Sequence, residues 1–259
     1  MRSMFTALAA TLSVATAVPA MAQLKGYQEI AVTDGGRIAG RVTMKGNAPA
    51  RERLDITKDK AVCGKTEKFA ETLVVSANGG VANAVVYLRA MAKGKPWLPH
   101  EELVQEDCRF RPHVLLVPQG GDLRVVNTDR IGHHVRAAGP HIRLNVIQPR
   151  YVEKLLVPAL AKEGLPETVS EVWCDIHPWM HAHIVVEQHP YYAVTCEDGS
   201  FRLTGVPPWQ YDLAIWHERL GDATRRVTVD PNGETSVSFE MELGDRPAPS
   251  RPGRRGRPL

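Results

Sequence analysis

Apolar and polar residues alternate along most of this chain with a period of two, which predicts β-strands rather than helices. Residues 37–44 place Ile38, Val42 and Met44 on one face of such a strand. Residues 225–243 show the same alternation on both sides of an Asn-Gly pair, which is typical of a hairpin turn. Further strands are predicted within residues 83–89, 113–127, 183–188 and 196–217. Many short strands separated by turns predict an all-β chain built from sandwiches or barrels.

One segment, residues 154–164 with the sequence "EKLLVPALAKE", has a composition that suggests a helix. Pro158 lies in its middle and would remove a helical hydrogen bond. We therefore expect a turn or loop there.

The first 22 residues differ in composition from the rest. They have a basic start and an apolar middle, and they end in the small-residue run Ala20-Met21-Ala22. This pattern predicts a secretory signal peptide that is cut before Gln23. An amphipathic helix is the alternative, but the run lacks the polar stripe that such a helix requires. No later segment reaches the roughly 18 apolar residues of a membrane span, and no cysteine directly follows the cleavage site. We expect a periplasmic protein without an anchor.

The formal net charge of +3 is set by the two ends of the chain. Residues 244–259 contribute +4 and Arg2 contributes +1, so residues 23–243 carry a formal charge of −2. A nearly neutral body does not favour nucleic acid as a partner. The tail, residues 244–259, is rich in Pro, Gly and Arg and is expected to be disordered. We interpret it as a solubilising tail, with contact to anionic lipid or to an acidic partner as the alternative.

The stretch "CDIHPWM" contains three residues that bind soft metals, namely Cys174, His177 and Met180. A thiolate, an imidazole and a thioether favour copper or zinc over magnesium or calcium. Blue-copper electron-transfer sites combine two histidines and a cysteine with a weak methionine ligand, so a second histidine is needed. His133 in "NTDRIGHH" is the candidate. The C-x-x-C-H motif of haem c and the H-E-x-x-H motif of zinc hydrolases are absent, and structural zinc would require more cysteines.

Together, "NTDRIGH" and "CDIHPWM" resemble the cupredoxin family. The Cys-x2-His-x2-Met spacing, with Pro after the His, is most similar to the ligand loop of amicyanin. The upstream run "CRFRPHVLLVPQGGDLRVVNTD" is similar to the strand, turn and strand that precede the first cupredoxin ligand. The match covers about residues 102–187. It implies a cupredoxin Greek-key β-sandwich with one type 1 copper, held by His133, Cys174, His177 and Met180.

One position departs from the family pattern. Cupredoxins usually have Asn after the first ligand histidine, whereas this chain has His134. The alignment favours His133 as the ligand, with His134 as the alternative. Because neighbouring side chains of an extended segment point to opposite faces, both are not expected to reach one copper.

A second resemblance covers residues 189–221, through the elements A-V-T-x-x-D-G-S-F, G-V-P-P and Y-x-L. These are similar to the carboxypeptidase regulatory-like, or transthyretin-like, domain, which is a small and usually non-catalytic β-sandwich. Residues 36–90 are similar to its first strands. They and residues 188–243 are expected either to complete one sandwich around an inserted cupredoxin domain or to form consecutive domains. Exported proteins of the methylamine-utilisation-like kind resemble this fusion.

The expected organisation has five parts. These are a signal peptide, 1–22; an N-terminal β segment, 23–100; a cupredoxin domain, 101–187; a carboxypeptidase regulatory-like domain, 188–243; and a disordered tail, 244–259. The N-terminal β segment is expected either to stand alone or to be part of the regulatory-like sandwich.

The four cysteines are Cys63, Cys108, Cys174 and Cys196. In an oxidising compartment an even number of cysteines allows disulfides, with three full pairings for four residues. If Cys174 binds copper, a Cys63–Cys108 bridge is the favoured pair and Cys196 stays free. Such a bridge would stabilise the fold by about 3–5 kcal/mol. Links from Cys196 to Cys63 or to Cys108 are the alternatives.

The remaining histidines are interpreted as structural. His181 and His183 face the same side of a strand, and we favour exposed polar positions over a second metal site. His113 is expected at a strand edge. His217 and Glu218 have no visible partners in the sequence and are expected to be structural. His177 is expected to be exposed beside Trp179, as electron carriers need a ligand edge at the surface.

The sequence therefore predicts a periplasmic type 1 copper protein that carries one electron between redox partners of unknown identity. It is not expected to be an enzyme, because no nucleophile–base pair and no open metal position is evident. The alternatives are a copper-binding or delivery protein without redox turnover, and an accessory β-sandwich interaction module whose copper site is vestigial.

Overall fold

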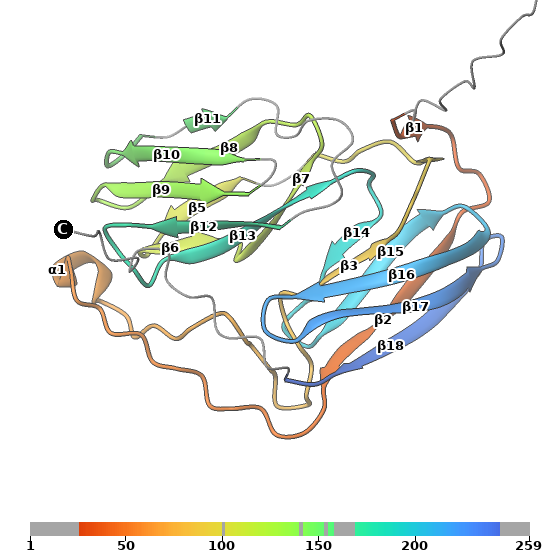
Figure 1. The fold of residues 1–259 in the computed structure, drawn as a ribbon, viewed down its shortest axis with the longest axis horizontal. Helices are drawn as coiled ribbons and strands as arrows, with labels where there is room; N and C mark the ends of the chain where they lie inside the picture. Colours follow the sequence, from red (N-terminus) through yellow and green to blue (C-terminus); the bar gives the residue numbers. More distant parts are fainter. Residues whose placement is uncertain (1–25, 100–101, 140–141, 153–154, 158–168, 244–259) are drawn as a thin grey trace, which may run out of the picture.

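A computed structural model describes residues 26–99, 102–139, 142–152, 155–157 and 169–243 (Figure 1). The expected signal peptide, its cleavage site before Gln23 and the basic tail lie outside the described residues. Within the described part the chain is almost entirely β, with one short helix, α1 (Lys60–Cys63). The prediction of an all-β chain with sandwich architecture is confirmed. The described part has no helix that is long and apolar enough to cross a membrane.

The first sandwich consists of two facing sheets (Figure 1). Its five-stranded sheet has the order β10 (Arg143–Gln148), β9 (His133–Ala138), β12 (Val169–Cys174), β13 (His181–Glu187) and β7 (Val114–Pro118). Its four-stranded sheet has the order β11 (Leu155–Val157), β8 (Leu123–Asn127), β5 (Leu103–Glu106) and β6 (Arg109–Arg111). Residues 155–157 are thus a strand, where the sequence favoured a turn or loop.

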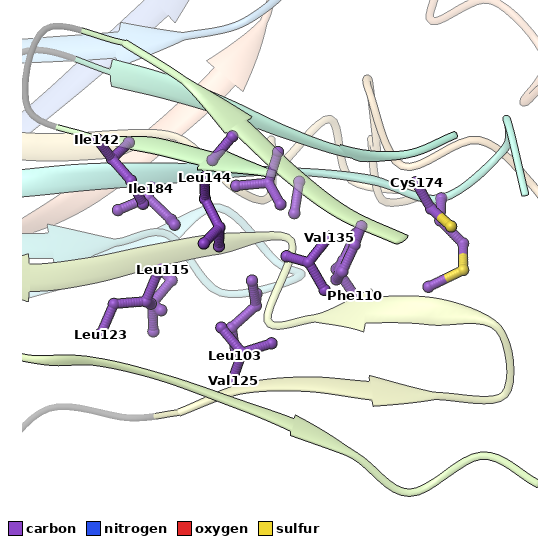
Figure 2. Close-up of a cluster of buried hydrophobic side chains, with 14 of the residues drawn as sticks. Leu103, Phe110, Leu115, Leu123, Val125, Val135, Ile142, Leu144, Cys174 and Ile184 are labelled. Carbon is purple, nitrogen blue, oxygen red and sulfur yellow. The ribbon is translucent and has the colours of Figure 1, made fainter. Parts of the chain in front are cut away.

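Alternate residues of these strands point inward and form one apolar core between the two sheets. Figure 2 shows Cys174 at one end of this cluster of buried side chains. The core includes Leu103, Phe110, Leu115, Leu123, Val125 and Val135. The end of β12 and the start of β9 meet at the Cys174 end of this core.

The second sandwich combines strands from both ends of the chain. One sheet has the order β14 (Tyr192–Val194), β3 (Val85–Leu88), β16 (Trp209–His217) and β17 (Gly221–Val229). The other has the order β15 (Ser200–Val206), β2 (Gly36–Met44) and β18 (Glu234–Met241). Strands β1 (Gln28–Glu29) and β4 (Lys93–Gly94) form a separate parallel pair. All strands of the first sandwich lie, in chain order, between β3 and β14.

The two sandwiches meet through a small apolar cluster. Val114 and Val185 of the first sandwich are buried together with Val85 and Tyr192 of the second. The rings of Tyr87 and Tyr192 stack beside them, with centroids 5.0 Å apart. A few buried apolar contacts therefore hold the sandwiches side by side.

A long connection, residues 45–80 (the arm), leaves the second sandwich after β2 and places α1 against one end of the first sandwich (Figure 1). A disulfide joins Cys63 at the end of α1 to Cys108, between β5 and β6. The Lys68 ammonium lies 2.9 Å from Asp107, and Arg109 lies 2.8 Å from Glu71. The predicted Cys63–Cys108 pairing is confirmed, and Cys174 and Cys196 are free.

Removing this disulfide should destabilise the protein strongly. The bridge closes a loop of 45 residues, so replacing both Cys63 and Cys108 by serine should lower the free energy of unfolding by about 4 kcal/mol in the chain-entropy model. Urea unfolding followed by circular dichroism measures this. Cys196→Ser, which changes an exposed free thiol, is the matched control and should leave the midpoint unchanged. A loss below about 1 kcal/mol would show that the arm stays docked without its covalent link.

Candidate metal centre

The loop between β8 and β9 is closed by the side chain of Asn127. Its amide Nδ2 donates to the carbonyl oxygens of Ile131, at 2.9 Å, and of Pro149, at 3.0 Å. Its Oδ1 accepts a hydrogen bond from the backbone N–H of Asp129, at 3.0 Å. The N-x-D pattern thus has a physical cause, because Asn shapes the turn that delivers His133 to the first residue of β9.

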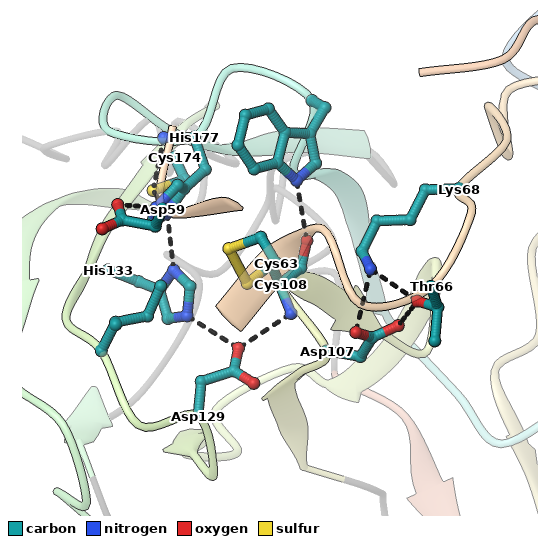
Figure 3. The surroundings of a disulfide bond; sticks show 12 residues. Asp59, Cys63, Thr66, Lys68, Asp107, Cys108, Asp129, His133, Cys174 and His177 are labelled. Atoms are coloured by element: carbon teal, nitrogen blue, oxygen red, sulfur yellow. Dashed lines mark hydrogen bonds and ion pairs between the residues drawn. A yellow bond between two sulfur atoms is a disulfide. The ribbon is translucent and has the colours of Figure 1, made fainter. Parts of the chain in front are cut away.

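The imidazole of His133 is completely buried and is held at both ring nitrogens (Figure 3). Its Nε2–H donates to Asp129 Oδ2, at 2.8 Å. The same carboxylate oxygen accepts the backbone N–H of Cys108, at 2.9 Å. Donation from Nε2 leaves Nδ1 to face Nδ1 of His177, at 3.0 Å. Burial lowers the pKa of His133, but its hydrogen bond to Asp129 and its contact with Cys174 outweigh this effect, so the pKa of His133 is raised overall.

Cys174 ends β12, and the chain turns back tightly to start β13 at His181. The turn is closed by hydrogen bonds from Cys174 N–H to the Met180 carbonyl, at 3.2 Å, and from Met180 N–H to the His177 carbonyl, at 2.9 Å. The sulfur accepts backbone N–H groups of His134, at 3.3 Å, and His177, at 3.4 Å. These geometries point the thiol into the space between the two imidazoles.

The same contacts favour the thiolate form of Cys174. Burial alone raises the pKa of this thiol, but its contacts with His133 and His177 and the hydrogen bonds from two backbone N–H groups lower it to about 6. A thiolate is the form of cysteine that binds metals. The side chain is therefore prepared for a cation before any metal is considered.

His177 does not lie at the surface, so the prediction of an exposed histidine is wrong. Its relative exposure is 0%. Its Nδ1 is 3.7 Å from the Cys174 sulfur, and its Nε2–H donates to Asp59 Oδ2, at 2.9 Å. Asp59 directly precedes α1 on the arm, 118 residues away in the sequence. The arm therefore covers the edge of His177 that the sequence placed at the surface.

Asp59 adopts a left-handed backbone conformation, with φ of 49° and ψ of 39°. This region is costly for most residues, but Asp and Asn tolerate it better than others. Asp59 lies four residues before Cys63, whose disulfide to Cys108 anchors α1 (Figure 3). The disulfide thus helps to hold Asp59 in its strained conformation, in which the carboxylate contacts His177.

The structure brings three of the four expected ligands together. One donor atom from each of His133, Cys174 and His177 lies within 4.8 Å of the others, and all three side chains are buried. Met180 is also buried, at 1% exposure, in the same core cluster as Cys174. Trp179 packs against that core and donates from Nε1 to the Cys108 carbonyl, at 3.1 Å.

His134 points out of this cluster. Its ring contacts Asn145 Oδ1, at 2.6 Å, and Asp175 Oδ2, at 3.2 Å. It touches the cluster only through its backbone N–H, which donates to the Cys174 sulfur. The alternation of side chains along β9 separates the two neighbouring histidines in this way.

The donor set fits a copper ion. A thiolate and two imidazoles are soft to borderline ligands, which select copper or zinc, and the buried Met180 belongs to the same core cluster as Cys174. Each imidazole gives its Nε2–H to a carboxylate, which fixes the ring and leaves an Nδ1 lone pair for a metal. Two such lone pairs facing each other at 3.0 Å favour a cation between them.

Two supporting groups were not identified from the sequence. Asp129 belongs to a motif that the sequence singled out, but its hydrogen bond to His133 depends on the folded loop. Asp59 gives no sequence signal, because its contact with His177 exists only when the arm folds back onto the first sandwich.

No protein-family model matches this chain, and no curated protein matches it either. Among solved structures, it is similar to amicyanin from Paracoccus versutus, with a TM-score of 0.27 and 16% identity over 39% of this chain and 97% of that one. It is also similar to a purple cupredoxin from Nitrosopumilus maritimus, with a TM-score of 0.26 and 18% identity over 30% of this chain and 82% of that one.

A third neighbour is the Cu-containing nitrite reductase NirK from Thermus scotoductus SA-01, with a TM-score of 0.27 and 19% identity over 38% of this chain. The chain spans about a quarter, 24%, of that protein's length. Each of these neighbours matches only part of this chain.

Proposed function

We propose that this chain is an exported one-electron carrier with one type 1 copper, held by His133, Cys174, His177 and Met180. The observation that carries the proposal is the buried cluster in which the Cys174 sulfur and two imidazole Nδ1 atoms face one another. When bound, copper would supply a one-electron couple between Cu(I) and Cu(II).

The protein fixes the donors before the metal arrives. Asp129 and Asp59 hold the two imidazoles, and two backbone N–H groups hold the sulfur. Complete burial of His133 and His177 excludes water from the donors. A site that does not rearrange between the two oxidation states transfers electrons quickly, because little reorganisation accompanies each step. Met180 at the end of the ligand turn would add the weak thioether contact typical of blue-copper sites.

The proposal includes no catalytic reaction. A substrate that reacts at a metal needs an open coordination position. Here His133 and His177 are completely buried, and Nε2 of His177 is hydrogen-bonded to the Asp59 carboxylate. The enclosure of the cluster therefore favours electron transfer over chemistry on a bound substrate.

One observation favours a second candidate, a copper-binding or delivery protein without redox turnover. Asp59 on the arm covers the edge of His177 through which a carrier would pass electrons. A covered ligand edge would slow exchange with a protein partner, and it would suit a protein that holds copper until the arm is released.

The visible spectrum of the copper-loaded protein tests the main proposal. The oxidised protein should be intensely blue or green, because the Cys174 thiolate gives charge transfer to copper, and Cys174→Ser should be nearly colourless. Reversible reduction and reoxidation in repeated cycles distinguishes a carrier from a storage protein. A colourless Cu(II) complex of the wild-type chain would refute the type 1 site, and an intensely coloured protein that does not cycle would favour the second candidate.

A further inference from the structure

A second group of metal-binding side chains lies where the two sandwiches meet. His181 and His183 belong to β13, and His113 directly precedes β7, all in the first sandwich. Glu218 follows β16 in the second sandwich. One donor atom from each of the four residues lies within 4.8 Å of the others. The expectation of an exposed polar position is wrong for His183, which is 6% exposed, and His113 and Glu218 are buried beside it.

Glu218 is the centre of this group. Its Oε1 lies 2.5 Å from Nε2 of His113 and 3.8 Å from Nδ1 of His183. The rings of His181 and His183 are perpendicular, with centroids 4.7 Å apart. The His113 ring lies 5.8 Å from that of His183. Three imidazoles thus surround one carboxylate that comes from the other sandwich.

Several polar atoms of this group have no hydrogen-bond partner among the described residues. They are Nδ1 of His113, His181 and His183, and Oε2 of Glu218. Leaving a buried donor or acceptor unsatisfied costs about 1–3 kcal/mol for each group. Four such atoms in one small volume are hard to reconcile with a purely structural role. A cation bound by these side chains would give their lone pairs a partner.

His181 is oriented by a carboxylate at Nε2, as metal-binding histidines commonly are. Its Nε2–H donates to Glu171 Oε1, at 2.8 Å, which leaves Nδ1 with a lone pair. A carboxylate behind an imidazole fixes the ring orientation and raises its basicity as a ligand. The same arrangement backs His133 and His177 in the proposed copper site.

We propose that His113, His181, His183 and Glu218 form a second metal site, which takes a divalent ion of the zinc and copper type and joins the two sandwiches. Three imidazoles and one carboxylate suit these borderline ions, whereas magnesium and calcium prefer oxygen ligands. The site is distinct from the Cys174 cluster because it contains no sulfur. It does not depend on whether the Cys174 cluster carries electrons.

The two sites are adjacent in the chain, which gives the second one a structural consequence. His181 directly follows Met180. An ion held by His181 and His183 would fix the start of β13, and with it the end of the turn that carries Met180. It would also link β13 to Glu218, so that the two sandwiches are held by a metal bridge as well as by their small apolar contact.

Zinc binding by a chain without the Cys174 cluster tests the proposal directly. In a full-length variant with both His133 and Cys174 replaced by alanine, we expect one tightly bound zinc ion per chain. X-ray absorption should show nitrogen and oxygen ligands at about 2.0–2.2 Å and no sulfur. Wild-type protein that is loaded first with one equivalent of copper and then with zinc should hold two metal ions per chain, which covers the case that the double variant does not fold.

Glu218→Gln in the same background isolates the carboxylate. Zinc affinity should fall by more than about 100-fold, since the loss of a group that only supports a ligand already costs about 10–100-fold. Glu187→Gln is the control, because Glu187 is a buried carboxyl group of β13 that lies outside the cluster. This variant should bind zinc with the same affinity as its parent. Absence of stoichiometric zinc in both the double variant and copper-loaded wild type would overturn the proposal. So would sulfur in the zinc coordination sphere of the double variant, or equal zinc affinity in the Glu218 and Glu187 variants.

Discussion

Replacing His133 by alanine will abolish the intense visible absorption of the copper-loaded protein, whereas His134→Ala will preserve it. The His133 ring is completely buried and faces His177 Nδ1 at 3.0 Å, so its loss would remove one of the residues that would hold the proposed copper. The His134 ring points away and bonds to Asn145 and Asp175. Absorption spectra of the two variants at equal copper content measure the difference.

Added imidazole provides the control for this pair of variants. It should restore colour to His133→Ala by replacing the missing ring, and it should change nothing in His134→Ala. His134→Ala keeps the backbone N–H that donates to the Cys174 sulfur, so only a small shift in the band is expected. If His134→Ala were the colourless variant, the ligand assignment would be wrong by one residue.

Asp59→Asn should raise the reduction potential of the proposed copper and weaken its binding of Cu(II). The carboxylate lies 2.9 Å from His177 Nε2, and its negative charge favours the more highly charged oxidation state. Removing such a partner costs about 10–100-fold in metal affinity. If only Cu(II) is affected, a one-electron couple shifts by about 59 mV for each factor of ten, so we expect a rise of about 60–120 mV in a voltammetric titration.

Asparagine is chosen because it tolerates the left-handed conformation of residue 59 and changes only the charge. Asp55→Asn is the matched control, since Asp55 is an exposed residue of the same arm. The reduction potential of copper in this variant should equal that in wild type. The variant that lacks the Cys63–Cys108 bridge should shift in the same direction as Asp59→Asn, because the arm then loses its covalent anchor. An unchanged potential in Asp59→Asn would show that the carboxylate does not act on the metal.

The sequence predicts the parts of the fold and of the site that depend on local spacing. The period-two pattern was enough for the all-β fold, since side chains alternate in any strand. The turn that carries Cys174 and His177 is only a few residues long, so its spacing could be read directly. The separation of His133 from His134 follows from the same alternation.

What the sequence could not predict depends on contacts between distant segments. The carboxylate that holds the outer nitrogen of His177 belongs to Asp59, 118 residues earlier in the chain. His113 meets Glu218 across 105 residues, and only after both sandwiches have formed side by side. Each of these residues taken alone is an ordinary polar position. Their roles arise from the docking of one folded part against another, which leaves no periodic signal.

The interleaving of β2 between β15 and β18 has a consequence for how the chain folds. Arg41 in β2 pairs with Ser200 on one side and with Ser238 on the other. The second sandwich therefore cannot close until β18, near the end of this sequence, has emerged from the ribosome. Strands β5 to β13 are complete long before that point, and contacts between distant residues form slowly. We expect the first sandwich to fold first, as a unit, while β2 and β3 remain unpaired until the later strands are synthesised.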